Sequence, residues 1–173
     1  MKLYRASRFN RLRTVVSVAL LAVLVSACTL TIQPGPGGIG SELNNVIVDF
    51  RPTRGVGAVY GVGEEIQFLL QTSSPGYVTL SAIDPDGTVY ILSRNIPVPG
   101  GSVVLPTAEQ RVTYNAAPPR GFHRVRASFT STRTSETVVY SGRRGDGEWS
   151  NAISIEINPA PLRDVRETNL SIR

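Results

Sequence analysis

Apolar and polar residues alternate one by one in a series of short runs between residues 45 and 158. The clearest runs span 46–50, 66–70, 77–83, 88–92, 122–129 and 152–157, with shorter ones at 102–105 and 137–140. A period of two predicts β-strands that are buried on one face, and the Gly- and Pro-rich stretches between the runs predict turns. Two half-buried sheets hide their apolar faces by stacking. We therefore expect an all-β, immunoglobulin-like sandwich of seven or eight strands, without a sustained helix.

The first 27 residues predict an export signal. Five basic residues and no acidic one lie in Met1–Arg13, and the mostly apolar stretch Thr14–Ala27 follows. This stretch of 14 residues is shorter than the roughly 20 that a spanning helix needs, and the basic flank is typical of a signal peptide. Residues Val25-Ser26-Ala27-Cys28 resemble the bacterial lipobox. The resemblance implies cleavage before Cys28 and lipidation of its thiol; the alternatives are an uncleaved membrane anchor and a plain signal peptide.

Cleavage at this position changes the charge of the domain. The full sequence has 18 Lys and Arg residues against 13 Asp and Glu, a net charge of +5. Loss of the five basic residues before Cys28 leaves 13 of each sign over 146 residues. A neutral domain gives no support to nucleic-acid binding, which relies on a basic surface. Because Cys28 is the only cysteine, no intrachain disulfide can form, and a hydrophobic core must hold the domain together.

These patterns divide the chain into four parts. We expect a signal peptide over residues 1–27, a lipidated Cys and flexible tether over 28–44, a sandwich over 45–158 and a C-terminal tail over 159–173. The tether contains Pro34-Gly35-Pro36-Gly37-Gly38, and such a composition resists both helix and sheet. The tail follows Pro159 and Pro161, and the sequence leaves open whether it frays or forms a short closing helix or strand.

A set of turn glycines and strand residues has the order and spacing of a known family. Its pieces are Arg54-Gly55-x-Gly57-x-x-Tyr60-x-x-Gly63-Glu64, Pro75-Gly76-Tyr77-Val78, Asp84-Pro85-Asp86-Gly87, Leu92, Asn95 and Pro118-Pro119-x-Gly121. They resemble the bacterial domain of unknown function family 4384, over roughly Val46 to Phe129. The resemblance implies an exported, often lipid-anchored and β-rich domain, with no assigned enzymatic activity.

Three motifs have residue types that occur in catalytic or metal sites. His123 is the only histidine and has no nucleophile motif beside it, so a structural role is favoured over a Ser–His–Asp site. Asp84-x-Asp86-Gly87 resembles the start of a calcium loop, but a hairpin turn accounts for it better. Glu64 and Glu65 would point to opposite faces of a strand, which argues against a glycosidase pair. The sequence therefore predicts no catalytic residue, metal site or cofactor.

A polar, glycine-rich run from Ser141 to Trp149 is the predicted partner-binding surface. We expect it to be a loop between two strands, with Arg143, Arg144 and Trp149 as its anchors, because Arg and Trp are enriched at binding hot spots. The alternative is that Trp149 belongs to the core and the loop is mobile. A second group of arginines, Arg120, Arg124 and Arg126, would either meet an anionic polymer or form a solvated strand face.

The sequence favours a lipid-anchored, non-enzymatic module of the cell envelope that binds a protein partner or envelope polymer, or supports envelope assembly. The alternative is an envelope hydrolase with an unrecognised carboxylate-based site. Because Thr29, and not Asp, follows Cys28, similarity to lipoprotein sorting rules favours the outer membrane over the inner. The expected partners are the membrane, through the N-terminal lipid, and that envelope protein or polymer. Neither nucleic acid nor a small-molecule cofactor is expected.

Overall fold

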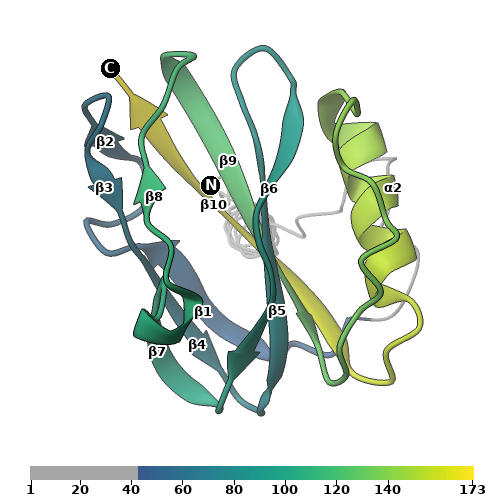
Figure 1. Ribbon diagram of the computed structural model, residues 1–173. Coiled ribbons are helices and arrows are strands. Elements are labelled where there is room, and N and C mark those ends of the chain that lie inside the picture. The colour runs from purple at the N-terminus through teal and green to yellow at the C-terminus, as the bar shows by residue number, and fades with distance from the viewer. Residues whose placement is uncertain (1–42) are drawn as a thin grey trace, which may run out of the picture. The chain divides into compact units, whose positions relative to one another are not determined.

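The computed structural model describes residues 43–173, so Cys28 and the predicted signal peptide lie outside the described residues. Ten strands, one 3₁₀ turn and one α-helix follow each other along this part of the chain (Figure 1). In chain order they are β1 (Ile47–Pro52), β2 (Ala58–Tyr60), β3 (Glu65–Ile66), β4 (Phe68–Thr72), β5 (Gly76–Ile83), β6 (Val89–Val98), β7 (Gly101–Leu105), η1 (Ala108–Gln110), β8 (Tyr114–Asn115), β9 (Gly121–Thr130), α2 (Gly145–Ile157) and β10 (Arg163–Ile172). None of the described helices is long and apolar enough to span a bilayer.

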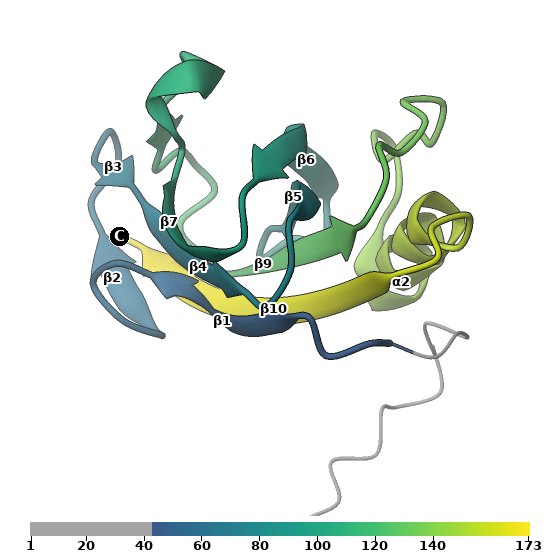
Figure 2. The ribbon, with the colours of Figure 1, turned by 90° about the horizontal axis from the view of Figure 1, so that it is seen from below.

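The strands form two main sheets and one short pair. The larger sheet has the order β2-β10-β9-β5-β6 and is antiparallel except for the parallel pair β10 and β2. The smaller sheet has the order β1-β4-β7, and β3 pairs with β8. One apolar core contains Phe68 and Leu105 from the smaller sheet together with Leu80 and Phe129 from the larger one. The two sheets therefore pack face to face, as Figure 2 shows from below.

The helix α2 forms a third layer on the other face of the larger sheet (Figure 1). Strand β5 lies in the middle and is buried on both faces, because its successive side chains point to opposite sides. Leu80 and Ala82 belong to the core between the sheets, whereas Ile83 belongs to a second core with Trp149 and Ile153 of the helix. The arrangement is thus sheet, sheet and helix.

The predicted sandwich is confirmed in its main features. Seven of the ten strands in the described part have five or more residues, which agrees with the expected seven or eight. The predicted hairpin is also present, because β5 and β6 are antiparallel neighbours joined by the turn at Asp84–Gly87. The amide of Gly87 donates to the carbonyl oxygen of Asp84 over 2.9 Å, and Gly87 has a φ of +84° that favours glycine.

The helix was not predicted, and it replaces both the expected strand at 152–157 and much of the expected loop at 141–149. Ile153, Ile155 and Ile157 alternate as in a strand, but Ile155 is half exposed. The buried residues Trp149, Ala152, Ile153 and Ile157 instead follow the spacing of one helical face. This short segment fits both the period of two of a strand and the period of 3.6 of a helix. The helix forms because its apolar face packs against the apolar outer face of the larger sheet.

One further segment differs from expectation, and another takes one of the forms that the sequence left open. The predicted strand at 137–140 has no strand partner. The predicted C-terminal tail, by contrast, contains β10, which lies between β2 and β9 and pairs with β9 along its whole length. The sandwich therefore extends past residue 158 to Ile172. Only Leu170 and Ile172 give β10 a clear apolar alternation, so the polar first half of the segment concealed a strand.

Candidate functional site

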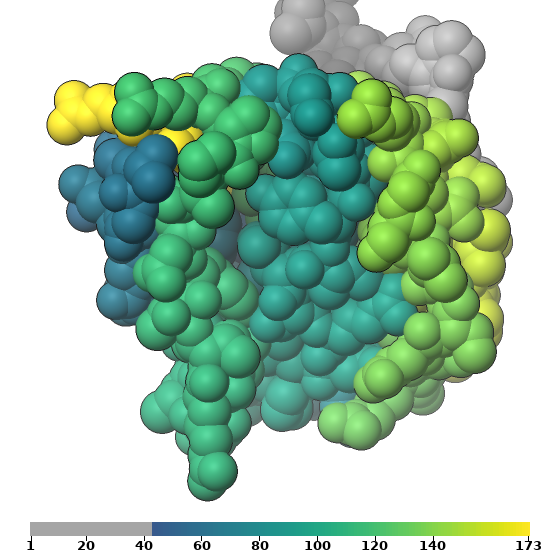
Figure 3. Space-filling model, turned by 45° about the horizontal axis from the view of Figure 1, so that its top comes forward, coloured from purple at the N-terminus to yellow at the C-terminus, as the bar shows by residue number. Residues whose placement is uncertain are grey.

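A cavity of about 460 Å³ opens between the larger sheet and the segment that carries β8. Figure 3 shows the surface hollowed between this segment and β6. The residues that line it are Ile66, Phe68, Ala82, Asp84, Tyr90, Ile91, Leu92, Thr113, Tyr114, Asn115, Ala117, Pro118, His123, Val125, Leu170 and Ile172. Most of these side chains are apolar or aromatic, so the cavity continues the core between the sheets outward to solvent.

Tyr114 closes one end of the cavity. Its hydroxyl donates to Ser93 Oγ over 2.9 Å, which joins β8 to β6, and it accepts a hydrogen bond from Gln110 Nε2. Its ring lies 6.2 Å from that of Phe68, between centroids. This contact anchors the short pair β3 and β8, which buries little on its own, against the rest of the sandwich. The segment that carries β8, which forms this wall of the cavity, is therefore attached both to β6 and to β4.

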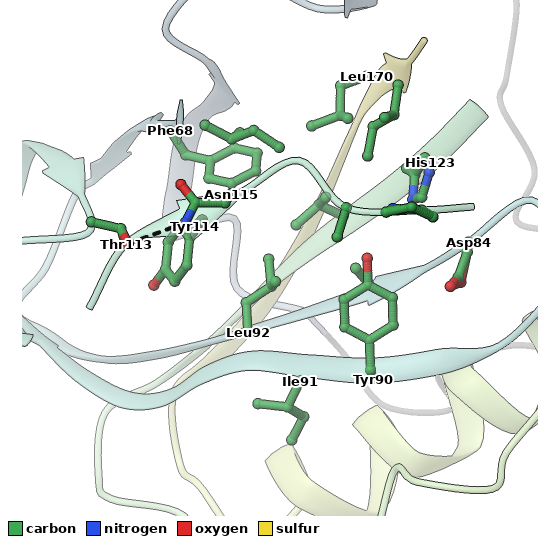
Figure 4. Close-up of a pocket in the computed structure, with 16 residues that line it drawn as sticks. Phe68, Asp84, Tyr90, Ile91, Leu92, Thr113, Tyr114, Asn115, His123 and Leu170 are labelled. Atoms are coloured by element: carbon green, nitrogen blue, oxygen red, sulfur yellow. Dashed lines mark hydrogen bonds between the residues drawn. The ribbon is translucent and has the colours of Figure 1, made fainter. Parts of the chain in front are cut away.

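The other end is polar and contains Asp84, Tyr90 and His123 (Figure 4). Asp84 is the first residue after β5, whereas Tyr90 and His123 belong to β6 and β9. The alternation in β6 aims Tyr90 and Leu92 into the cavity and Ile91 toward the helix (Figure 4). These residues, separated by up to 39 positions in sequence, are brought together because β5 lies between β6 and β9 in the sheet.

His123 is buried, and its Nε2 lies 2.8 Å from the carbonyl oxygen of Pro119. Because a carbonyl oxygen only accepts, Nε2 must carry the hydrogen and donate it. In the neutral ring, Nδ1 is then an acceptor. The structural role that the sequence favoured for His123 fits this bond, which ties β9 to the loop before it, although the ring also lines the cavity.

Asp84 carries a carboxylate oxygen, Oδ1, that is buried and has no hydrogen-bond partner among the described residues. Burial raises the pKa of Asp84, and repulsion from Asp86 raises it further, while His123 and Arg144 act in the opposite direction. Burial, with a contribution from the charge of Asp84, also raises the pKa of Tyr90 to about 12. Both groups are thus held in surroundings that disfavour their ionised forms.

The cavity suits noncovalent binding better than hydrolysis. Asp84 is the only carboxylate that lines it, whereas glycoside hydrolysis uses two across one bond. The lining also places no serine beside His123, and its Nε2 already donates to Pro119. Within residues 43–173, no group of three His, Cys, Asp or Glu side chains is arranged to hold a metal ion.

Trp149 does not lie on the surface where the sequence placed it. Its side chain is fully buried, its Nε1 donates to Ser81 Oγ over 2.8 Å, and the guanidinium of Arg126 lies 4.0 Å from its ring centroid. The alternative in which Trp149 belongs to the core is therefore the correct one, and Trp149 cannot anchor a partner. An indole at the first buried position of a helix is covered by the sheet, which the sequence did not reveal.

The arginines near it have separate surroundings. Arg144 is exposed and lies 3.8 Å from Asp86 in the hairpin turn, while Nε of half-buried Arg143 donates to the carbonyl oxygen of Val139. Arg124 and Arg126 both contact Asp146 and Glu167, so neither is a free charge for an anionic polymer. Arg120 is exposed in the loop before β9.

Sequence reasoning considered Asp84 and His123 separately and missed Tyr90 and Tyr114. The alternation in β6 is the signal that could have pointed to Tyr90, because it places Tyr90 and Leu92 on the same face of the strand. This pattern does not show which face borders a cavity. Asp84 was interpreted as part of a turn, which is correct for its backbone. Only the pairing of β5 with β6 and β9 brings its carboxylate to the cavity.

Comparison with known proteins gives limited further information. No curated protein matches the chain significantly. Among solved structures, the CARDB domain of a Pyrococcus furiosus protein, solved in complex with di-metal ions, is 16% identical with a TM-score of 0.30. The match covers 78% of this chain and 96% of that one.

A family model gives a more specific match. It covers residues 59–133, which contain every lining residue of the cavity except Leu170 and Ile172. The cavity is therefore built almost wholly from the matched segment. The model is that of the family described as "Domain of unknown function (DUF4384)", so the resemblance seen in the turn glycines and strand residues is confirmed over residues 59–133.

Proposed function

We propose that this chain is a non-enzymatic binding module of the cell envelope, which holds part of a protein partner or envelope polymer in the cavity beside β6. One observation carries the proposal: a cavity of about 460 Å³ with apolar walls and a few polar groups at one end. Binding sites typically have volumes of roughly 300–1,000 Å³ and this kind of lining. A sandwich that needed only to fold would gain stability by filling this space.

The composition of the cavity supports binding over catalysis. The carboxylate-based hydrolase that the sequence left as an alternative would need a second acid near Asp84, and the lining supplies none. Asp84 and His123 alone offer an acceptor and an imidazole, without a nucleophile to activate. No observation therefore favours the hydrolase as a second candidate.

The envelope location is proposed from the sequence. The lipobox-like quartet ending at Cys28 supports a lipid anchor, and Thr29 after it supports the outer membrane over the inner. A lipid anchor would keep the module near envelope partners, where a weak cavity interaction is helped by a high effective concentration.

Occlusion of the cavity tests the proposal. Thr113 is exposed and lines the opening, so Thr113→Trp should fill the entrance without disturbing the core. Val112 is 44% exposed and does not line the cavity, so Val112→Trp is a matched control. With lipidated full-length protein in solubilised envelope, we expect Thr113→Trp to lose its stoichiometric partner and Val112→Trp to retain it. Equal capture by both variants, at unchanged melting temperature, would refute the proposal.

Arg143 and Arg144 remain proposed partner contacts outside the cavity. Arg144 pairs with Asp86 in the turn that follows Asp84, so a partner at the polar end of the cavity would pass close to it. The double change Arg143→Ala and Arg144→Ala should weaken partner capture and change the melt little, because Arg144 is exposed and Arg143 donates to a backbone carbonyl at the surface. Unaltered capture would exclude the two arginines as contacts.

A further inference from the structure

The polar end of the cavity has an acceptor that nothing in the described chain satisfies. Asp84 Oδ1 is buried without a hydrogen-bond partner, although buried carboxylates normally accept several hydrogen bonds. The rest of this turn is satisfied: the amide of Asp84 donates to the carbonyl oxygen of Thr88, and that of Thr88 donates to Asp86 Oδ1. The unmet requirement is therefore confined to the side chain that lines the cavity.

The charges around Asp84 leave this end of the cavity negative. Asp86 and Arg144 lie 3.8 Å apart, and Asp86 raises the pKa of Asp84 more than Arg144 lowers it. His123 is the other group that acts on Asp84, and its Nε2 hydrogen is directed to Pro119. His123 and Arg144 are thus the groups that favour the charged form of Asp84, but neither donates a hydrogen bond to Oδ1, and a positively charged donor would relieve the burial of this carboxylate.

The neighbouring polar atoms also favour a donor. In the neutral ring of His123, Nδ1 is a lone-pair acceptor, because Nε2 carries the hydrogen. The hydroxyl of Tyr90 projects into the same end of the cavity and can accept as well (Figure 4). A carboxylate, an imidazole nitrogen and a phenol oxygen around one space match a group with several N–H donors and no acceptor, as an ammonium has.

The apolar walls of the cavity determine the chemistry of the rest of the ligand. Phe68, Leu92 and Leu170 line the cavity beyond the polar end, and their surface requires an apolar body. We propose that the cavity binds a primary ammonium group carried on an apolar stem or ring, with the ammonium at Asp84. This inference rests on the proposed function of the cavity as a binding site and assigns its chemical class of ligand.

Three probes of similar shape separate charge from shape. Phenethylammonium is a cation, phenethyl alcohol is its neutral counterpart, and phenylacetate is an anion. Saturation-transfer NMR on the full-length protein in detergent, with detergent alone as a blank, reports the binding of each. We expect phenethylammonium to bind about tenfold or more tightly than phenethyl alcohol, since one charge-assisted hydrogen bond accounts for such a factor. Phenylacetate should not bind.

Asp84→Asn keeps the shape of the side chain and removes its charge. It should reduce the affinity for phenethylammonium to that for the alcohol, while Thr113→Trp should abolish the binding of both and Val112→Trp of neither. Equal affinities for cation and alcohol, unchanged by Asp84→Asn, would overturn the ammonium assignment and leave the cavity as a binding site. No binding of any probe would overturn the ammonium assignment, whereas the proposed function is refuted separately, by equal partner capture with Thr113→Trp and Val112→Trp.

A lysine side chain and a free amine share this chemistry. Nα-acetyl-lysine-methylamide, compared with phenethylammonium, distinguishes the two sources. Tighter binding of the lysine derivative supports an ammonium presented by a protein partner, and tighter binding of phenethylammonium supports a free aromatic amine. In either case Asp84→Asn should reduce the affinity for both probes, and unchanged affinities contradict the proposal.

Discussion

Trp149 Nε1 donates a hydrogen bond to Ser81 Oγ over 2.8 Å, and both residues are completely buried. The bond joins α2 to the middle of β5. Arg126 from β9 covers the indole ring on one side, with its guanidinium 4.0 Å from the ring centroid and paired with Glu167. The helix is thus attached to the sheet by a buried polar contact and by a large apolar side chain.

This contact predicts the effect of changing Trp149. Trp149→Ala should lower the free energy of unfolding by about 3–5 kcal/mol, because it opens a large cavity under the helix. Trp149→Phe should cost about 1–3 kcal/mol, because Ser81 Oγ then loses its partner. Urea denaturation followed by circular dichroism measures both. Exposed Arg144→Ala is the control and should change stability by about 0.5 kcal/mol or less; a Trp149→Ala variant as stable as the control would contradict the packing.

Tyr140 anchors the segment before the helix. Its hydroxyl donates to Oε2 of buried Glu156 over 2.6 Å, and Thr79 and Thr134 donate to the other carboxylate oxygen. Tyr140→Phe should therefore destabilise the protein by about 1–3 kcal/mol at neutral pH, through the donor that Glu156 loses. Comparison of urea midpoints checks this, and an unchanged midpoint would show that the bond contributes nothing.

The same residue predicts behaviour at alkaline pH. Burial, with the negative charge of Glu156, raises the pKa of Tyr140 above its ordinary 10.0. The folded protein then holds this proton more tightly than the unfolded chain, so stability is constant below about pH 10 and falls as the pH rises further. Tyr140→Phe should show a shallower alkaline loss of melting temperature. The slope will not vanish, because the pKa of Tyr90 is also raised, to about 12.

The raised pKa of Asp84 should make stability depend on pH in the direction opposite to that of most carboxylates. Because burial raises its pKa above the ordinary 3.8, the folded state binds the proton more tightly, and stability is lost as the pH rises from about 3.8 through the raised pKa. Asp84→Asn should remove this loss. Its melting temperature should exceed that of the wild type by a margin that grows over that range and then stays constant. A margin that shrinks with rising pH would show that Asp84 is stabilised by its surroundings.

Cys28 predicts how the protein is retained. Cys28→Ser should release the domain from membranes, because no acyl chains remain to insert into the bilayer. Fractionation of the envelope measures the release, and mass spectrometry of the wild-type N-terminal peptide should show a diacylglyceryl thioether. A mature protein that still contains Met1–Ala27 would contradict lipidation at Cys28.

Local sequence patterns were enough to predict the strand-rich character and the hairpin at Asp84–Gly87. Both depend on local rules: successive strand residues face opposite sides, and Asp, Pro and Gly have the backbone preferences of a turn. The resemblance to DUF4384 used the same residues and is confirmed for that reason. Local patterns of this kind need no knowledge of what lies on the other side of a sheet.

Tertiary structure decided the rest. Ile153, Ile155 and Ile157 alternate as in a strand. In the structure, however, they belong to a helix that covers the outer face of the larger sheet, which buries Ile153 and Ile157 and leaves Ile155 half exposed. The polar first half of β10 becomes part of a strand because β9 pairs with its full length. Asp84, Tyr90 and His123 meet only because β5 lies between β6 and β9. Burial and strand order depend on long-range packing, which a local sequence period does not encode.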